Sequence, residues 1–78
     1  MPKRAIDYAL AVCDYCRHRG ISELTQQELA AIIEIAVGAD ERTAKKYLPL
    51  MRKWQLVVPA QSEGMLRIDF DRAEEMIL

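Results

Sequence analysis

The chain has 78 residues, a formal net charge of −1 and 51% hydrophobic residues, which is the composition of one small soluble globular domain. No apolar run approaches the length that crosses a membrane, and the N-terminus lacks the apolar stretch of a signal peptide. We therefore expect a cytoplasmic protein with no membrane contact, in which the two cysteines stay reduced.

The first predicted element is a helix over about residues 3–18, which ends near Gly20 because glycine tolerates the positive φ of a helix C-terminus. Five apolar residues share one face at helical spacing: Ile6, Ala9, Leu10, Cys13 and Cys16. Three more extend this face sideways: Tyr8, Val12 and Tyr15. The face is wider than one core contact requires. Either the C-terminal helix of the same chain or a second copy of the chain could cover it, and we favour the second copy.

Two capped helices joined by a tight turn follow a short extended segment at residues 21–24. Thr25 and Glu28 have the spacing of a capping box, in which each side chain bonds a free amide at the start of the helix. Four apolar residues then repeat at helical spacing and are expected to face inward: Leu29, Ile32, Ile33 and Ala36. Gly38 is expected to end this helix, and Asp40 to cap the next one.

The third predicted helix spans about residues 41–55, with Ala44, Leu48 and Met51 as its core stripe. Residues 41–54 contain five Lys/Arg and one Glu, a local charge of +4, so the rest of the chain sums to −5. Pro49 lies in the outward row, where water can satisfy the carbonyl that proline leaves free, so we expect a bend and not a break. A positive element on a negative body is typical of a docking surface for an anionic partner, and DNA is the leading candidate.

After the third helix the apolar period changes from 3.6 to 2. Residues 56–60 and 65–70 are predicted to form a β-hairpin around the turn-forming residues 61–64. Pro59 restricts the first of these strands to the edge of a sheet. Asp71 and Glu74 predict a capped terminal helix over about residues 71–78.

This order of elements resembles that of winged helix-turn-helix DNA-binding domains. The resemblance spans about residues 4–70 and is carried by four motifs: Thr25-x-x-Glu28-Leu29-Ala30, Asp40-Glu41-Arg42-Thr43, Tyr47-Leu48 and Leu56-Val57-Val58. It implies a mainly α, α+β fold with a three-helix core. Residues 1–78 would then be one domain, with the helix-turn-helix at about 25–55, the wing at about 56–70 and the terminal helix at about 71–78.

In that family the second helix of the pair enters the major groove, and the hairpin, or wing, rests on the backbone or minor groove. The resemblance implies contacts to base edges from Arg42, Thr43 and Lys46, and contacts to phosphates from Lys45, Arg52 and Lys53. The wing tip contains Glu63 and no basic residue, so Arg67 at its base is the one residue of the wing that we expect to contribute affinity.

The sequence therefore predicts sequence-specific binding of double-stranded DNA by a small transcriptional regulator, as a homodimer through the first and last helices. The alternative is a winged-helix protein-interaction module within a replication or transcription assembly, in which the basic row meets an acidic protein surface. A slightly acidic isoelectric point of about 5.8 favours that alternative. A third interpretation is that the basic residues simply form a solvated outer face of the helix and bind no partner.

Cys13 and Cys16, followed by His18, raise the question of redox or metal chemistry. A thioredoxin-like pair needs a helix N-terminus, and zinc needs four converging ligands, whereas His18 points away from the two cysteines. Small buried hydrophobic residues are the better interpretation. There is one histidine, no Gly-rich phosphate loop and no nucleophile beside a base. We therefore predict neither an enzyme nor a site for a metal, cofactor or small molecule.

Overall fold

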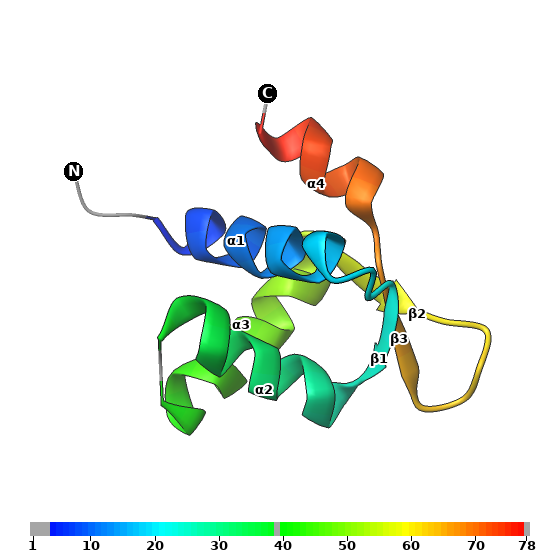
Figure 1. Ribbon diagram of the computed structural model, residues 1–78, viewed down its shortest axis with the longest axis horizontal. Helices are drawn as coiled ribbons and strands as arrows, with labels where there is room; N and C mark the ends of the chain where they lie inside the picture. Colours follow the sequence, from blue (N-terminus) through cyan, green and yellow to red (C-terminus); the bar gives the residue numbers. More distant parts are fainter. Residues whose placement is uncertain (1–3, 39, 78) are drawn as a thin grey trace.

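The computed structural model describes residues 4–38 and 40–77, which form four helices and a three-stranded antiparallel sheet (Figure 1). In chain order the elements are α1 (Ala5–His18), β1 (Glu23–Thr25), α2 (Gln26–Val37), α3 (Glu41–Lys53), β2 (Val57–Pro59), β3 (Met65–Ile68) and α4 (Phe70–Ile77). The α+β class predicted from the sequence is confirmed. Lys3, predicted as the first residue of α1, and residue 78 lie outside the described residues. Within the described residues, no helix is long and apolar enough to cross a membrane.

Both ends of α2 and the start of α3 follow the predicted capping residues. The Thr25 hydroxyl accepts a 3.1 Å hydrogen bond from the Glu28 amide, and the Glu28 carboxylate accepts a 2.9 Å bond from the Thr25 amide. Gly38 ends α2 at φ 69°, and Asp40 accepts a 3.0 Å bond from the Thr43 amide at the start of α3. The Thr25, Glu28 and Asp40 side chains thus satisfy backbone amides that the start of a helix leaves without a partner.

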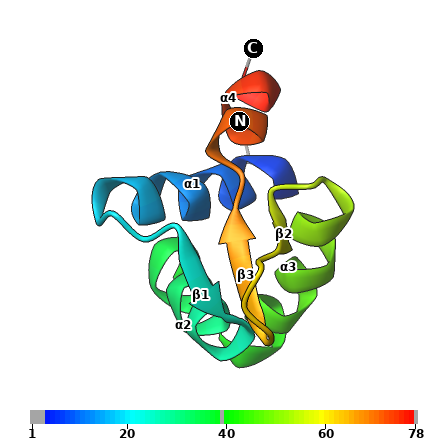
Figure 2. The ribbon, with the colours of Figure 1, turned by 90° about the vertical axis from the view of Figure 1, so that its right-hand side faces the viewer.

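The sheet has the order β1-β3-β2, with both neighbours antiparallel to β3 (Figure 2). β2 is therefore an edge strand, which accommodates Pro59 as predicted. Alternation along β3 turns Ile68 into the core and Arg67 to solvent. Helices α1, α2 and α3 all lie on the same side of the sheet (Figure 1).

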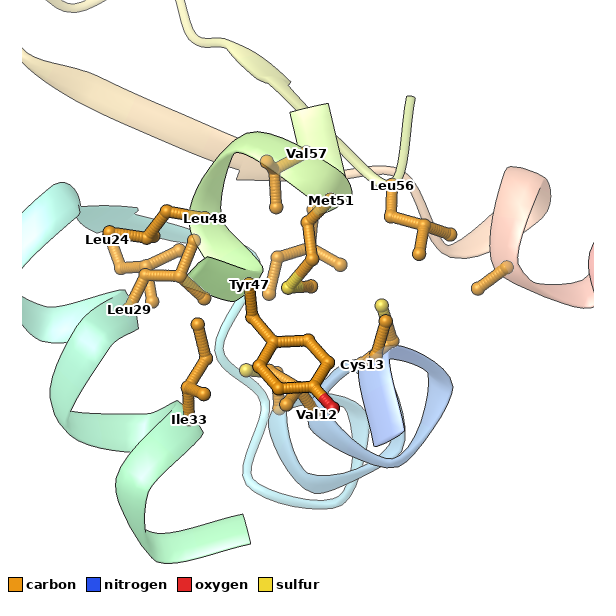
Figure 3. Close-up of a cluster of buried hydrophobic side chains, with 14 of the residues drawn as sticks. Val12, Cys13, Leu24, Leu29, Ile33, Tyr47, Leu48, Met51, Leu56 and Val57 are labelled. Atoms are coloured by element: carbon orange, nitrogen blue, oxygen red, sulfur yellow. The ribbon is translucent and has the colours of Figure 1, made fainter. Parts of the chain in front are cut away.

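One hydrophobic core joins the three helices to the sheet (Figure 3). The predicted stripe of α3, Ala44, Leu48 and Met51, is buried within it. Val12, predicted at the side of the α1 face, is fully buried. Its fully or nearly fully buried partners on α1 are Ala9, Cys13 and Cys16.

The C-terminal part differs from the prediction in two respects. α4 begins at Phe70, which was predicted as the last residue of a strand. Its cap is Asp69 and not Asp71, because the Asp69 carboxylate accepts a 3.0 Å hydrogen bond from the Arg72 amide. The physical reason is long-range: the amides of Ile68 and Asp69 bond the carbonyls of Ser22 and Leu56, so these two residues stay extended and the helix begins after them.

α4 packs against α1 of its own chain. The Arg17 guanidinium lies 5.6 Å from the centre of the Phe70 ring, and its Nη1 lies 3.6 Å from the Glu74 carboxylate. Tyr8 of α1, by contrast, lies against α3, since its ring meets the ring of Tyr47 edge to face, with the ring centres 6.3 Å apart. α4 thus contacts a different flank of α1 from that of Tyr8, Val12 and Tyr15, which the sequence left open to the C-terminal helix or to a second copy of the chain.

Candidate nucleic-acid interface

Helix α3 presents a continuous positive surface opposite its buried stripe. Arg42, Lys46 and Lys53 are all exposed. At about 100° per residue they fall within roughly 40° of one another around the helix axis. We call these three residues the basic ridge. Within the described residues, no carboxylate lies at ion-pair distance from any of them. Their charges are therefore available to an anionic partner.

Two further cations, Lys45 and Arg52, lie on the flank of α3 that faces α2. Lys45 Nζ is 3.4 Å from Glu41 Oε1, and both side chains are largely exposed. An exposed pair of this kind holds its members together only weakly, so a phosphate could displace the carboxylate. Arg52 has no such partner within the described residues, and it lines a hollow with Gln26 and Leu66. Arg52 is thus the freer of the two charges.

The remaining two predicted residues lie apart from the ridge. Thr43 is half-buried on the opposite flank of α3 from Lys45, and its amide is engaged by Asp40. Arg67 lies on the outer face of the sheet, directly across from Glu23 of β1. An opposite charge at a cross-strand position offsets part of the positive potential of Arg67. Six of the seven predicted residues therefore lie on α3, five of them on its exposed basic side with Thr43 at the margin, and Arg67 lies on the sheet.

The positive potential of α3 is not uniform along its length. Asp40 and Glu41 place two carboxylates at the N-terminal end, where negative charge interacts favourably with the positive end of the helix dipole. Hydrogen bonds from the backbone and hydroxyl of Thr43 lower the pKa of Asp40, so it remains ionised. The cations dominate from Lys45 to Lys53. An anion is accordingly expected to lie over the middle and C-terminal part of the helix.

A groove between α2 and α3 was not anticipated from the sequence. It has a volume of about 920 Å³, and its floor includes Ala30, Ala31 and Leu48. A second hollow of about 390 Å³ adjoins it and shares Gln26, Leu48 and Pro49. Ala30 and Ala31, which are adjacent in α2, could have indicated this groove from the sequence, because small side chains leave space between packed helices.

Both cysteines are buried in the hydrophobic core. Burial raises the pKa of Cys13 to about 12 and that of Cys16 to about 11, so both thiols are protonated near neutral pH. His18 lies on the exposed side of α1, with Nδ1 at 2.9 Å from the Asp14 carbonyl oxygen. Nowhere in residues 4–38 and 40–77 do three His, Cys, Asp or Glu side chains gather as a metal site would require.

Comparison of the chain with models of protein families, with curated proteins and with solved structures finds no match.

Proposed function

We propose that this protein binds double-stranded DNA in a sequence-specific manner and acts as a small transcriptional regulator. The observation that carries the proposal is the basic ridge: three exposed cations, without ion-pair partners among the described residues, on one face of a helix whose other face is buried. An α-helix fits the major groove of B-DNA, where base edges are accessible. The order of the helices and the hairpin is consistent with a winged helix-turn-helix arrangement, which we propose for this chain.

In this mode the cations have different tasks. Arg42 suits a guanine, because its guanidinium can donate two hydrogen bonds to O6 and N7. Lys46 is placed to reach a base edge from the same ridge. Lys45, Arg52 and Lys53 would contact phosphates, which hold the protein in register without reading sequence. Thr43 remains a proposed base contact at the margin of this surface.

The hairpin should add little affinity. The loop residues 61–64 are exposed and include Glu63, which phosphates would repel. Arg67 is the hairpin's cation, and Glu23 lies across from it. DNA affinity is therefore expected to come mainly from α3.

The test is a titration of duplex DNA at several salt concentrations, with wild type and an Arg42→Ala/Lys46→Ala variant. Released counterions make log K fall linearly with log salt, by about 0.9 per neutralised phosphate. The variant should bind more weakly, and a shallower slope would show that Arg42 or Lys46 also neutralises a phosphate. The matched control is Arg4→Ala/Arg19→Ala, which removes the same charge from the region of α1. Equal effects of the two variants would show that only net charge matters and would refute the assignment to α3.

The groove between α2 and α3 favours a second candidate function, a protein-interaction module. In that case the basic row meets an acidic protein surface, and the apolar floor of the groove receives a side chain of the partner. Affinity for duplex DNA no better than about millimolar at low salt, or an Arg42→Ala/Lys46→Ala variant that binds like wild type, would support this candidate.

We further propose that the regulator is a homodimer through α1 and α4. The support is the exposed apolar end of α4, where Ile77 is 65% exposed. A two-fold dimer would read two half-sites about 10–10.5 bp apart or a multiple of that spacing.

A further inference from the structure

An exposed proline lies at the centre of the positive surface of α3. On a helix, the surface neighbours of a residue are those three and four positions away. For Pro49 these four neighbours are Lys45, Lys46, Arg52 and Lys53, and all are exposed cations. Pro49 itself is exposed, although it is apolar and the helix continues past it to residue 53. A rigid uncharged ring is thus surrounded by four positive charges.

This arrangement is not needed for the stability of the helix. Like charges at these spacings destabilise a helix, and proline within it forfeits a hydrogen bond. Among these four cations, Lys45 is the one that has an ion-pair partner within the described residues, Glu41 at 3.4 Å. The surface is therefore complementary to a ligand that has anionic groups around an apolar centre.

The major groove of B-DNA offers this chemistry at one kind of base pair. Its walls are lined by phosphates, and its floor presents a single type of apolar group, the C5-methyl of thymine. We propose that Pro49 is a specificity-determining residue that packs against the C5-methyl of a thymine while Lys45, Arg52 and Lys53 contact the flanking phosphates. This inference rests on the proposed DNA-binding function and adds the base that the centre of α3 prefers.

Proline suits this task because of what it lacks. Its ring offers no donor or acceptor to a base edge, so it gains nothing from the polar groups of adenine, guanine or cytosine. Its side chain has no rotamer freedom to lose on binding. Cytosine carries hydrogen where thymine carries the methyl group, so packing against this ring distinguishes the two pyrimidines.

The experiment begins with selection of bound duplexes from a random pool by the wild-type protein. Each thymine of the selected site is then replaced, one at a time, by deoxyuridine, which removes only the methyl group. Loss of one buried methyl corresponds to roughly a threefold to fivefold weaker Kd. We expect this loss at one thymine of each half-site for wild type. A Pro49→Ser variant keeps every cation and restores the backbone amide, and it should bind the thymine and uracil duplexes equally.

The outcomes separate this inference from the function on which it rests. Specific binding in which no uracil substitution weakens the complex would overturn the role of Pro49 and leave the DNA-binding function intact. So would a Pro49→Ser variant that distinguishes thymine from uracil as well as wild type does. Failure to bind any duplex at low salt would overturn the proposed function itself.

Discussion

The Arg72 side chain donates a 3.1 Å hydrogen bond from Nε to the backbone carbonyl of Trp54. Trp54 immediately follows α3, and a carbonyl at this end of a helix has no partner within the helix. The bond therefore links α4 to the end of the helix that carries the basic ridge. The bond joins residues 18 positions apart, so no local pattern in the sequence predicts it.

Replacing Arg72 with alanine should destabilise the fold. The hydrogen bond is charge-assisted but the side chain is partly exposed, at 39%, so we expect a loss of about 1 kcal/mol in the free energy of unfolding. The control is Glu75→Ala, which removes only the exposed 3.4 Å contact to Arg72 and should cost little. Urea denaturation followed by circular dichroism measures both. Equal losses in the two variants would contradict the role assigned to the Trp54 carbonyl.

Gln55 is a site where glycine should stabilise the protein. Its φ is 63°, a left-handed conformation that is unfavourable for a residue with a Cβ, and it follows the end of α3. We expect Gln55→Gly to raise stability by about 0.5–1 kcal/mol and the melting temperature by about 2–8 °C. Gly20→Ala provides the converse test at the end of α1, because φ is 68° there and an added Cβ meets no atom within 4 Å. Thermal melts that moved both variants in the same direction would contradict the backbone explanation.

The helix caps should make stability fall at acid pH. Hydrogen bonds from Thr43 lower the pKa of Asp40 below its ordinary value of 3.8, and those with Thr25 lower the pKa of Glu28 below 4.5. A carboxylate with a lowered pKa stabilises the fold above its unfolded pKa and loses this contribution as pH falls through the folded value. Stability should therefore decline from about pH 4.5 downward.

An Asp40→Asn variant isolates the contribution of this titration. Asparagine keeps the oxygen that accepts the Thr43 amide but carries no charge, so the acid limb of its stability curve should be shallower than that of wild type. Asp40→Ala loses the cap altogether and should be less stable at neutral pH as well. Chemical denaturation between pH 2.5 and 7 gives the curves, and an acid limb unchanged in Asp40→Asn would exclude Asp40 as a source.

The proposed dimer can be tested with two isoleucines that are almost equally exposed. Ile77 on α4 is 65% exposed and Ile35 on α2 is 64% exposed. Placing a charge in an apolar interface prevents association, whereas a charge on free surface has little effect. Sedimentation at micromolar concentration should give a dimer for wild type and for Ile35→Asp, and a monomer for Ile77→Asp. A 9 kDa species for wild type would remove the dimer proposal.

Much of the helical part could be predicted because its signals are local. The capping box of Thr25 and Glu28 lies within one helical turn, as does the bond between Asp40 and Thr43. The burial of Ala44, Leu48 and Met51 follows from the 3.6-residue period, and that period also turns the basic ridge outward. The resulting alignment of Arg42, Lys46 and Lys53 needed no knowledge of the rest of the chain.

Other features depend on residues that are distant in sequence, and only the tertiary structure decided them. Asp69 caps α4 because the carbonyls of Ser22 and Leu56 accept the amides of Ile68 and Asp69 and hold these residues extended up to the start of the helix. The partial offset of the positive potential at Arg67 follows from strand register, which places Glu23 opposite it. A one-dimensional pattern contains the spacing of side chains along each element, since that spacing is fixed by backbone geometry. The contacts between elements depend on how their apolar faces fill a common core. They can therefore be determined only when all the elements are considered together.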